Sequence, residues 1–322
     1  MTRRPAGLCQ QVRVAVIDCG TNSIRLLIAD IDPERARLTD IAREMKIVRL
    51  GEGVDRTGRL SEAALDRTIG ALREYTDLID QARPQAVRMV ATSATRDAEN
   101  SQEFVDRVKE VLGVAPEVVS GDEEAQLSFT GATRELAGAA AGQFPPPYLV
   151  TDIGGGSTEF VLGGPAGVSG GRSVDIGCVR MTERHLHGDP PSPAEVAPAT
   201  ADIDDAIAVV AANVPVHQAK TLIGLAGSVT TVAGIALGLG HYDSIRIHHS
   251  RVPAERVHEI AGQLLGQTRA QRAAIGVMHP GRVDVIGAGA LVLDRIMIRL
   301  GFAGVLVSEH DILDGIAWSL VP

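Results

Sequence analysis

One segment of the chain combines glycines, hydroxyls and acids in an order that suits phosphate binding. It reads Asp-Ile-Gly-Gly-Gly-Ser-Thr-Glu over residues 152–159 and follows an apolar run that is typical of a strand. Glycines let the backbone approach an anion closely, and consecutive backbone N–H groups can form an anion-binding nest. We therefore expect a phosphate loop that binds through Gly154, Gly155, Gly156, Ser157 and Thr158. A glycine-rich hairpin with incidental acids is the alternative.

Carboxylates stand at both ends of this loop, at Asp152 and Glu159. A hard divalent cation such as Mg²⁺ is bound by carboxylate oxygens and water, and Mn²⁺ accepts similar ligands. The two acids therefore predict a Mg²⁺ site beside the phosphate loop, with Mn²⁺ as a substitute.

An earlier segment has the same organisation. Residues 18–25 read Asp-Cys-Gly-Thr-Asn-Ser-Ile-Arg and again lie between two apolar runs. Each segment predicts a strand, a tight turn and a returning antiparallel strand. Asn22 and Ser23 can donate hydrogen bonds to phosphate, Asp18 can reach the metal or its waters, and Arg25 can either bind phosphate or cap a strand edge. Two such segments, far apart in the chain, predict duplicated halves that face each other across a cleft.

Other segments could contribute to the same site. Arg96 ends a hydroxyl-rich run after a predicted strand, where α/β sites usually form, although a helix cap would look the same. Gly227 and Ser228 lie in a glycine turn that opens a helix, which suits a phosphate or nucleotide, or only close packing. The acids of residues 122–124 are, on pattern alone, solvated side chains that complement a helix dipole. Arg282 could reach an anion, and no Walker or dinucleotide-binding motif is present.

The rest of the chain alternates between helix and strand patterns, which predicts an α/β fold. We expect strands at 86–91, 117–119, 222–225, 283–286 and 304–307, with a loop at 92–96 and a linker at 138–147. Helices are expected over 61–82, 100–112, 121–137, 192–212, 254–266, 287–300 and 311–320, with Ser61 as an N-cap.

Composition restricts the class of protein. The 322 residues are 45% hydrophobic and 22% charged, enough for about two domains with real cores. A net charge of −9 argues against a nucleic-acid or membrane-surface partner. The cysteines (Cys9, Cys19 and Cys178) have no CxxC spacing, and no apolar run reaches the ~18–20 residues of a membrane span. We expect a cytoplasmic protein with buried, reduced thiols.

Through the two Asp-x-Gly segments and the glycine turn at residues 227 and 228, the chain resembles the superfamily of actin, sugar kinases and heat-shock chaperone ATPases. Within it, DCGTNSIRLLI, SGDEEAQLSFTG and DIGGGSTEFVL resemble the exopolyphosphatase/guanosine pentaphosphatase family over about residues 12–320. The resemblance implies two actin-like (ribonuclease H-like) domains that face each other across a cleft, and it is compatible with a homodimer. The first domain would span 1–122, completed by a C-terminal helix at 310–322, and the second 123–309.

The resemblance assigns roles to the residues of this chain that match the family's motifs. Glu124 matches the glutamate that acts as general base for the attacking water, which replaces the solvated-acid interpretation. Asp152 and Glu159 match carboxylates linked to Mg²⁺. Phosphate contacts are implied for Asn22, Ser23, Arg96 and Gly154.

The activity that the resemblance implies is Mg²⁺-dependent hydrolysis of inorganic polyphosphate, with release of terminal orthophosphate. Alternatives are a guanosine pentaphosphate 5′-phosphohydrolase, a kinase, or a sensor that binds the alarmone (p)ppGpp or another nucleotide with little turnover. The chain resembles the short form of the family, without the extra helical domains of longer members. It also carries Glu-His-Asp-Ile-Leu-Asp-Gly at 309–315, where longer relatives commonly have Arg-Glu-Gly before the final helix, and acids in the cleft would repel a long polyanion. We therefore expect a preference for short chains.

Overall fold

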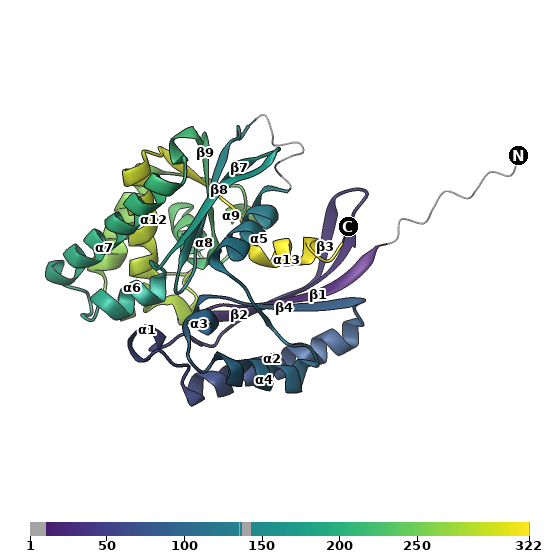
Figure 1. Ribbon diagram of the computed structural model, residues 1–322. Helices are drawn as coiled ribbons and strands as arrows, with labels where there is room; N and C mark the ends of the chain where they lie inside the picture. Colours follow the sequence, from purple (N-terminus) through teal and green to yellow (C-terminus); the bar gives the residue numbers. More distant parts are fainter. Residues whose placement is uncertain (1–10, 135, 137–142, 322) are drawn as a thin grey trace, which may run out of the picture.

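The computed structural model describes residues 11–134, 136 and 143–321, which form two mixed β-sheets with helices on their faces (Figure 1). The first sheet has the order β3-β2-β1-β4-β5. Its strands are β1 (Val12–Cys19), β2 (Ser23–Asp32), β3 (Arg37–Ile47), β4 (Ala86–Ala91) and β5 (Glu117–Val118).

The second sheet repeats this order. It runs β8-β7-β6-β9-β11 and adds the short strand β10 at the β11 edge. In each sheet the first three strands form an antiparallel meander and the next two run parallel to the central strand. The strands are β6 (Tyr148–Ile153), β7 (Thr158–Gly164), β8 (Gly167–Val174), β9 (Thr221–Leu225), β10 (Arg251–Pro253) and β11 (Gly304–Val307). The shared topology confirms the predicted pair of actin-like α/β domains.

The central strand β1 is buried on both sides of the first sheet. Successive residues of a strand point to opposite faces, so its alternate side chains pack against different helices. On β1, Ala15 and Ile17 pack under α2 (Glu62–Ala82) and α4 (Ser101–Leu112), whereas Val14 and Val16 pack against α13 (Ile312–Trp318). The C-terminal helix therefore covers a sheet built from the beginning of the chain (Figure 1).

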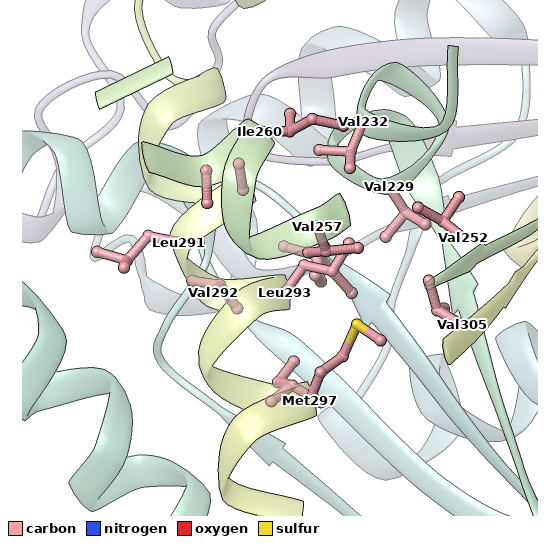
Figure 2. Close-up of a cluster of buried hydrophobic side chains, with 14 of the residues drawn as sticks. Val229, Val232, Val252, Val257, Ile260, Leu291, Val292, Leu293, Met297 and Val305 are labelled. Atoms are coloured by element: carbon pink, nitrogen blue, oxygen red, sulfur yellow. The ribbon is translucent and has the colours of Figure 1, made fainter. Parts of the chain in front are cut away.

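The second domain has the larger core. Valines, leucines and isoleucines from α8 (Ala226–Ala236), α10 (Ala254–Gly266) and α12 (Ile286–Leu300) pack together against the second sheet, as Figure 2 shows around Val229, Val257 and Leu293. This domain also contains α6 (Cys178–His185) and α7 (Pro193–Asn213). Aliphatic packing supplies this core because the chain contains few aromatic residues.

One helix pair joins the domains. α5 (Gly121–Thr133) packs on the second sheet through Phe129, and it also crosses α13. A Cβ on Gly131 would lie 1.8 Å from the Asp311 carbonyl oxygen, and one on Gly315 would lie 1.9 Å from that of Leu127. Only glycine allows this approach. The predicted domain boundary at residues 122 and 123 stays a prediction, since α5 runs through it without a break.

Most predicted elements are confirmed within a residue or two, including the Ser61 N-cap, which accepts a hydrogen bond from the Ala64 N–H. Two predictions were wrong. Residues 93–97 form a short helix, α3 (Ser93–Asp97), in place of the expected loop. Residues 283–285, expected in a strand at 283–286, form a turn that leads into α12 at Ile286. The helix predicted to reach residue 137 ends at Thr133, and most of the predicted linker lies outside the described residues.

Short helices complete the fold: α1 (Val54–Thr57), α9 (Ser244–Ile247), α11 (Arg269–Ala273) and 3₁₀ turns at Val216–Gln218 and Pro280–Arg282. Cys19 and Cys178 are buried free thiols, as expected, and Cys9 lies outside the described residues. None of the helices described is long and apolar enough to cross a bilayer.

Candidate active site

A cavity of about 90 Å³ lies between the two domains, where the turns after β1 and β6 meet the start of α8. Parallel strands place their carboxyl ends at one edge of a sheet, and here the two sheets present those edges to each other. Most of the predicted site residues line this cavity: Asp18, Asn22, Ser23, Glu124, Asp152, Gly154, Gly155, Ser157, Gly227 and Ser228.

The other predicted residues lie just behind the cavity wall. The Thr158 hydroxyl donates to the Ile176 carbonyl at 3.1 Å, so its side chain is used within the second domain. Glu159 is buried and accepts a hydrogen bond from the Ser173 hydroxyl at 2.7 Å. Gly156 packs against the opposing loop, and Arg96 contacts Glu124. The phosphate and metal roles of all these residues remain predictions.

The carbonyl oxygens of the glycine loop are hydrogen-bonded within the second domain. They accept hydrogen bonds from the first residues of α6: Gly177 N–H to Gly156 at 3.0 Å, Cys178 N–H to Gly154 at 2.9 Å, and Val179 N–H to Gly155 at 2.8 Å. In the described part of the chain, no hydrogen bond takes up the N–H of Gly155 or Gly156. These donors are therefore available to an anion in the way a backbone nest requires.

The two turns approach each other closely. A Cβ on Gly155 would lie 2.9 Å from the Cβ of Thr21, and one on Gly156 would lie 2.6 Å from the Ser93 hydroxyl oxygen. Thr21 and Ser93 share a buried hydrogen bond of 2.9 Å between their hydroxyls. The glycines thus allow residues 154–157 to sit against the first domain, so close packing explains the glycine motif independently of the predicted phosphate binding.

The hairpins differ in charge at equivalent positions. Asp18 lies opposite Arg25 across β1 and β2, and Asp152 lies opposite Glu159 across β6 and β7. Arg25 donates to Asp18 at 2.6 Å and also pairs with Asp311. The first hairpin therefore neutralises its acid with an arginine, whereas the second places two carboxylates face to face.

Burial gives these acids unusual proton affinities. It raises the pKa of Asp152 to about 6, and nearby Asp311 adds to the rise. Burial next to Asp152 raises the pKa of Glu159 to about 7. The pKa of Glu124 is raised well above its usual value, first by burial and then by the charge of Glu159. Burial is the largest cause of each shift, so the cluster lacks the solvation or positive charge that would stabilise three ionised acids.

A divalent cation fits this deficit. Burial raises the pKa of Asp18 even beside Arg25, and its Oδ1 is buried without a hydrogen-bond partner among the described residues. The described acids, histidines and cysteines do not form a cage of three or more protein ligands. Mg²⁺ does not need one, because it commonly binds through one or two carboxylates, waters and substrate phosphates. Asp152, Glu159 and Asp18 are the residues that would hold it, directly or through water.

Glu124 is oriented by an arginine. Arg96 lies at the end of α3, and its Nη1 is 3.2 Å from Glu124 Oε2 and 3.0 Å from the Val119 carbonyl oxygen. A buried carboxylate with a raised pKa and a fixed direction is suited to accept a proton from a water in the cavity. Arg96 therefore acts on Glu124 in this structure, and its predicted phosphate contact stays a prediction.

Some cavity residues carried little sequence signal. Arg282 is half-buried, lines the cavity and lies across Gly227, where a Cβ would be 2.2 Å from the guanidinium carbon. Cys178 also lines the cavity, and burial raises the pKa of its thiol. The position of Arg282 in the cavity requires a glycine at residue 227, which lies 55 positions earlier in the chain. Cys178 is brought to the cavity by the turn before α6. Neither residue therefore belongs to a contiguous motif.

The acidic C-terminal segment is largely neutralised. Asp311 pairs with Arg25, and Asp314 pairs with Arg43 at 2.7 Å. These arginines hold the pKa of Asp311 below its usual value although burial opposes the shift. Glu309 is therefore the acid of this segment that would mainly repel a polyanion. It lines a neighbouring cavity of about 450 Å³. That cavity meets the first one at Arg25, Gly227 and Arg282.

Comparisons with known proteins place the chain in a family. The model of the Ppx/GppA phosphatase family matches residues 27–322. The chain belongs to this family. Exopolyphosphatase 2 of Mycobacterium tuberculosis is 50% identical over 96% of the chain and 98% of its own length.

A solved structure and a more distant relative are also similar to the chain. A crystal structure of an exopolyphosphatase-like protein superposes with a TM-score of 0.91 at 42% identity, covering 96% of this chain and 98% of that one. A guanosine-5′-triphosphate,3′-diphosphate pyrophosphatase of Aeromonas salmonicida is 28% identical over 95% of this chain and 59% of its own. The family resemblance inferred from the motifs is confirmed.

The raised pKa values predict how stability depends on pH. Because Asp152 and Glu159 hold protons in the folded state at a pH where the unfolded chain has lost them, stability falls as pH rises from about 4 to about 7. In chelator-treated protein the thermal midpoint should drop over this window, by about 2–4 °C per kcal/mol lost. Mg²⁺ should restore the midpoint at pH 8 more than at pH 5. Equal effects of Mg²⁺ at both pH values would contradict a metal bound by these acids.

Proposed function

We propose that this protein is an exopolyphosphatase that uses Mg²⁺ to release terminal orthophosphate from inorganic polyphosphate, preferably from short chains. The observation that carries the proposal is the buried cluster of Glu124, Asp152 and Glu159 beside a backbone nest, in a family member that is 50% identical to an exopolyphosphatase. Glu124 favours turnover over simple binding, because a sensor needs no buried base aimed at its ligand.

In the proposed mechanism, the terminal phosphoryl group lies between the turns. The N–H groups of Gly155 and Gly156 donate to its oxygens from one side, Asn22 and Ser23 donate from the other, and Arg282 faces the bridging oxygens. A bound Mg²⁺ would neutralise phosphate charge at Asp152 and Glu159. Electrostatic positioning of this kind supplies most of the rate in phosphoryl transfer.

Glu124 would orient a water toward phosphorus and take its proton as the P–O bond to the water forms. The opposite P–O bond breaks, and the shortened polyphosphate leaves with the bridging oxygen. Arg96 keeps the Glu124 carboxylate directed at the cavity. The products are orthophosphate and a chain shorter by one phosphate.

One observation favours a nucleotide substrate as the second candidate. The neighbouring cavity has an apolar wall suited to a flat ring, made by Met45, Tyr242, Val277, Met278, Pro280 and Leu313. Its volume of about 450 Å³ falls within the range of small-ligand pockets. A guanosine pentaphosphate could place its base there and its terminal phosphate at the glycine loop.

A substrate panel separates the two candidates. Purified protein with Mg²⁺ would be given tripolyphosphate, long polyphosphate, ATP and guanosine pentaphosphate, and released orthophosphate would be measured. We expect the highest kcat/KM on tripolyphosphate. Turnover of guanosine pentaphosphate alone would replace the first proposal by the second. Binding of every ligand without phosphate release would identify a sensor.

A further inference from the structure

Arg180 connects the glycine loop to both domains. Its Nε donates to the Gly156 carbonyl oxygen at 2.8 Å, within the loop whose N–H groups are proposed to bind phosphate. Its Nη1 donates to Asp55 at 2.6 Å, and its Nη2 donates to Asp97. The loop and α6, which carries Arg180, belong to the second sheet's domain, whereas Asp55 and Asp97 lie on α1 and α3 beside the first sheet.

Each nitrogen of this guanidinium therefore has a different partner. The side chain of Arg180 is 12% exposed, and Asp175 is its only other acid nearby among the described residues, at 3.9 Å. A planar fork can hold a carbonyl and two carboxylates in fixed directions, whereas a lysine ammonium cannot reproduce that geometry. The loop carbonyl is thus fixed relative to two acids of the other domain.

Asp97 is connected to the opposite wall of the cavity, and Asp55 belongs to a second set of contacts between the domains. Asp97 ends α3, which begins with Ser93, and Ser93 shares a hydrogen bond with Thr21. Asp55 follows the turn at Gly53, whose N–H donates to Glu183 of α6 at 3.1 Å. A separation of the domains would remove Asp55 and Asp97 from Arg180, so that two of the three partners that fix the direction of its guanidinium would be lost.

We propose that Arg180 is a positioning residue that sets the direction of the phosphate loop and makes it depend on contact between the domains. This inference rests on the proposed phosphate-binding role of residues 154–157. In the closed arrangement, Arg180 holds the Gly156 carbonyl away from the cavity, so that the Gly155 and Gly156 N–H groups face the anion. An open cleft would release this constraint and weaken the nest.

Arg184 offers a matched control. It lies one turn later on α6 and donates to Asp55 through two nitrogens, at 2.7 and 2.8 Å, but it has no contact with the glycine loop. Arg180→Lys and Arg184→Lys therefore weaken the same contact between domains, and only the first removes the fork that fixes the loop.

The test measures binding of tripolyphosphate with Mg²⁺ by calorimetry, together with kcat. We expect Arg180→Lys to lower affinity about tenfold and kcat about 10²-fold, as small displacements in a reaction site do, and Arg184→Lys to change either by less than about threefold. Equal losses in both variants, or none in Arg180→Lys, would overturn the positioning role.

A second variant covers the case in which Arg180→Lys does not fold. Asp97→Asn leaves Arg180 in place and removes a partly exposed carboxylate that holds its Nη2 from the other domain. We expect affinity to fall about threefold to tenfold, and unchanged affinity would overturn the dependence on domain contact.

Because binding is measured apart from turnover, a protein that binds but releases no phosphate would refute the hydrolase proposal while leaving this inference intact. Absence of binding by the unaltered protein would overturn both.

Discussion

Glu124→Gln is expected to lower kcat on tripolyphosphate about 10²- to 10⁴-fold, the usual contribution of a general base. The reason is that glutamine keeps the size and the hydrogen-bonding reach of the side chain but cannot accept the proton from water. KM should change little, because the loops and the metal that would hold the phosphates are untouched. Steady-state phosphate release at saturating Mg²⁺ measures the effect.

The neighbouring glutamate supplies the control for this prediction. Glu123 is half-exposed and lies 3.2 Å from Arg88 on the surface, so Glu123→Gln should leave kcat within about twofold. Glu124→Gln should also be at least as thermally stable as the unaltered protein, since it removes a buried acid that Glu159 repels. A variant that keeps full activity, or loses it only by unfolding, would contradict the assignment of the base.

Asp152→Asn should raise the Mg²⁺ concentration for half-maximal activity by at least about tenfold. The substitution removes one of two facing carboxylates, and with it much of the charge that would attract the cation. Without divalent ions the variant should be more stable than the unaltered protein at pH 8, because the buried acid, whose pKa is about 6, must otherwise stay ionised. Activity titrations and thermal melts measure the two effects.

Ser128→Ala gives an intermediate case. The Ser128 hydroxyl donates to Asp152 Oδ2 at 2.8 Å, so its loss keeps the carboxylate but removes the bond that orients it. We expect a shift of a few-fold in the Mg²⁺ requirement, smaller than that of Asp152→Asn. If Asp152→Asn titrates like the unaltered protein, the metal does not depend on this acid.

Local sequence patterns predicted the parts of this site that depend on local structure. Apolar runs on both sides of each Asp-x-Gly segment indicated the two hairpins, and their similarity indicated duplicated domains. Acids, glycines and hydroxyls within one turn had to meet because a hairpin turn brings them together. Glu124 was different: its pattern favoured a solvated acid, and only the family resemblance assigned it a role.

Contacts between distant segments could not be inferred in this way. Arg25 meets Asp311 across 286 residues, and Arg96 meets Glu124 across 28. The partners of Arg180 likewise depend on how the domains are placed, and its segment has no phosphate-binding pattern of its own. The loop predicted at residues 92–96 was wrong because a single helical turn leaves too little periodicity to recognise.

The most direct test of the proposed activity follows the chain ends of polyphosphate. Polyphosphate of defined length would be incubated with the protein and Mg²⁺, and terminal phosphates, internal phosphates and orthophosphate would be resolved by ³¹P NMR. We predict that orthophosphate accumulates at the expense of internal phosphates while the number of chain ends stays constant, and that Glu124→Gln abolishes this conversion. A rising number of chain ends, or no orthophosphate at all, would contradict an exopolyphosphatase.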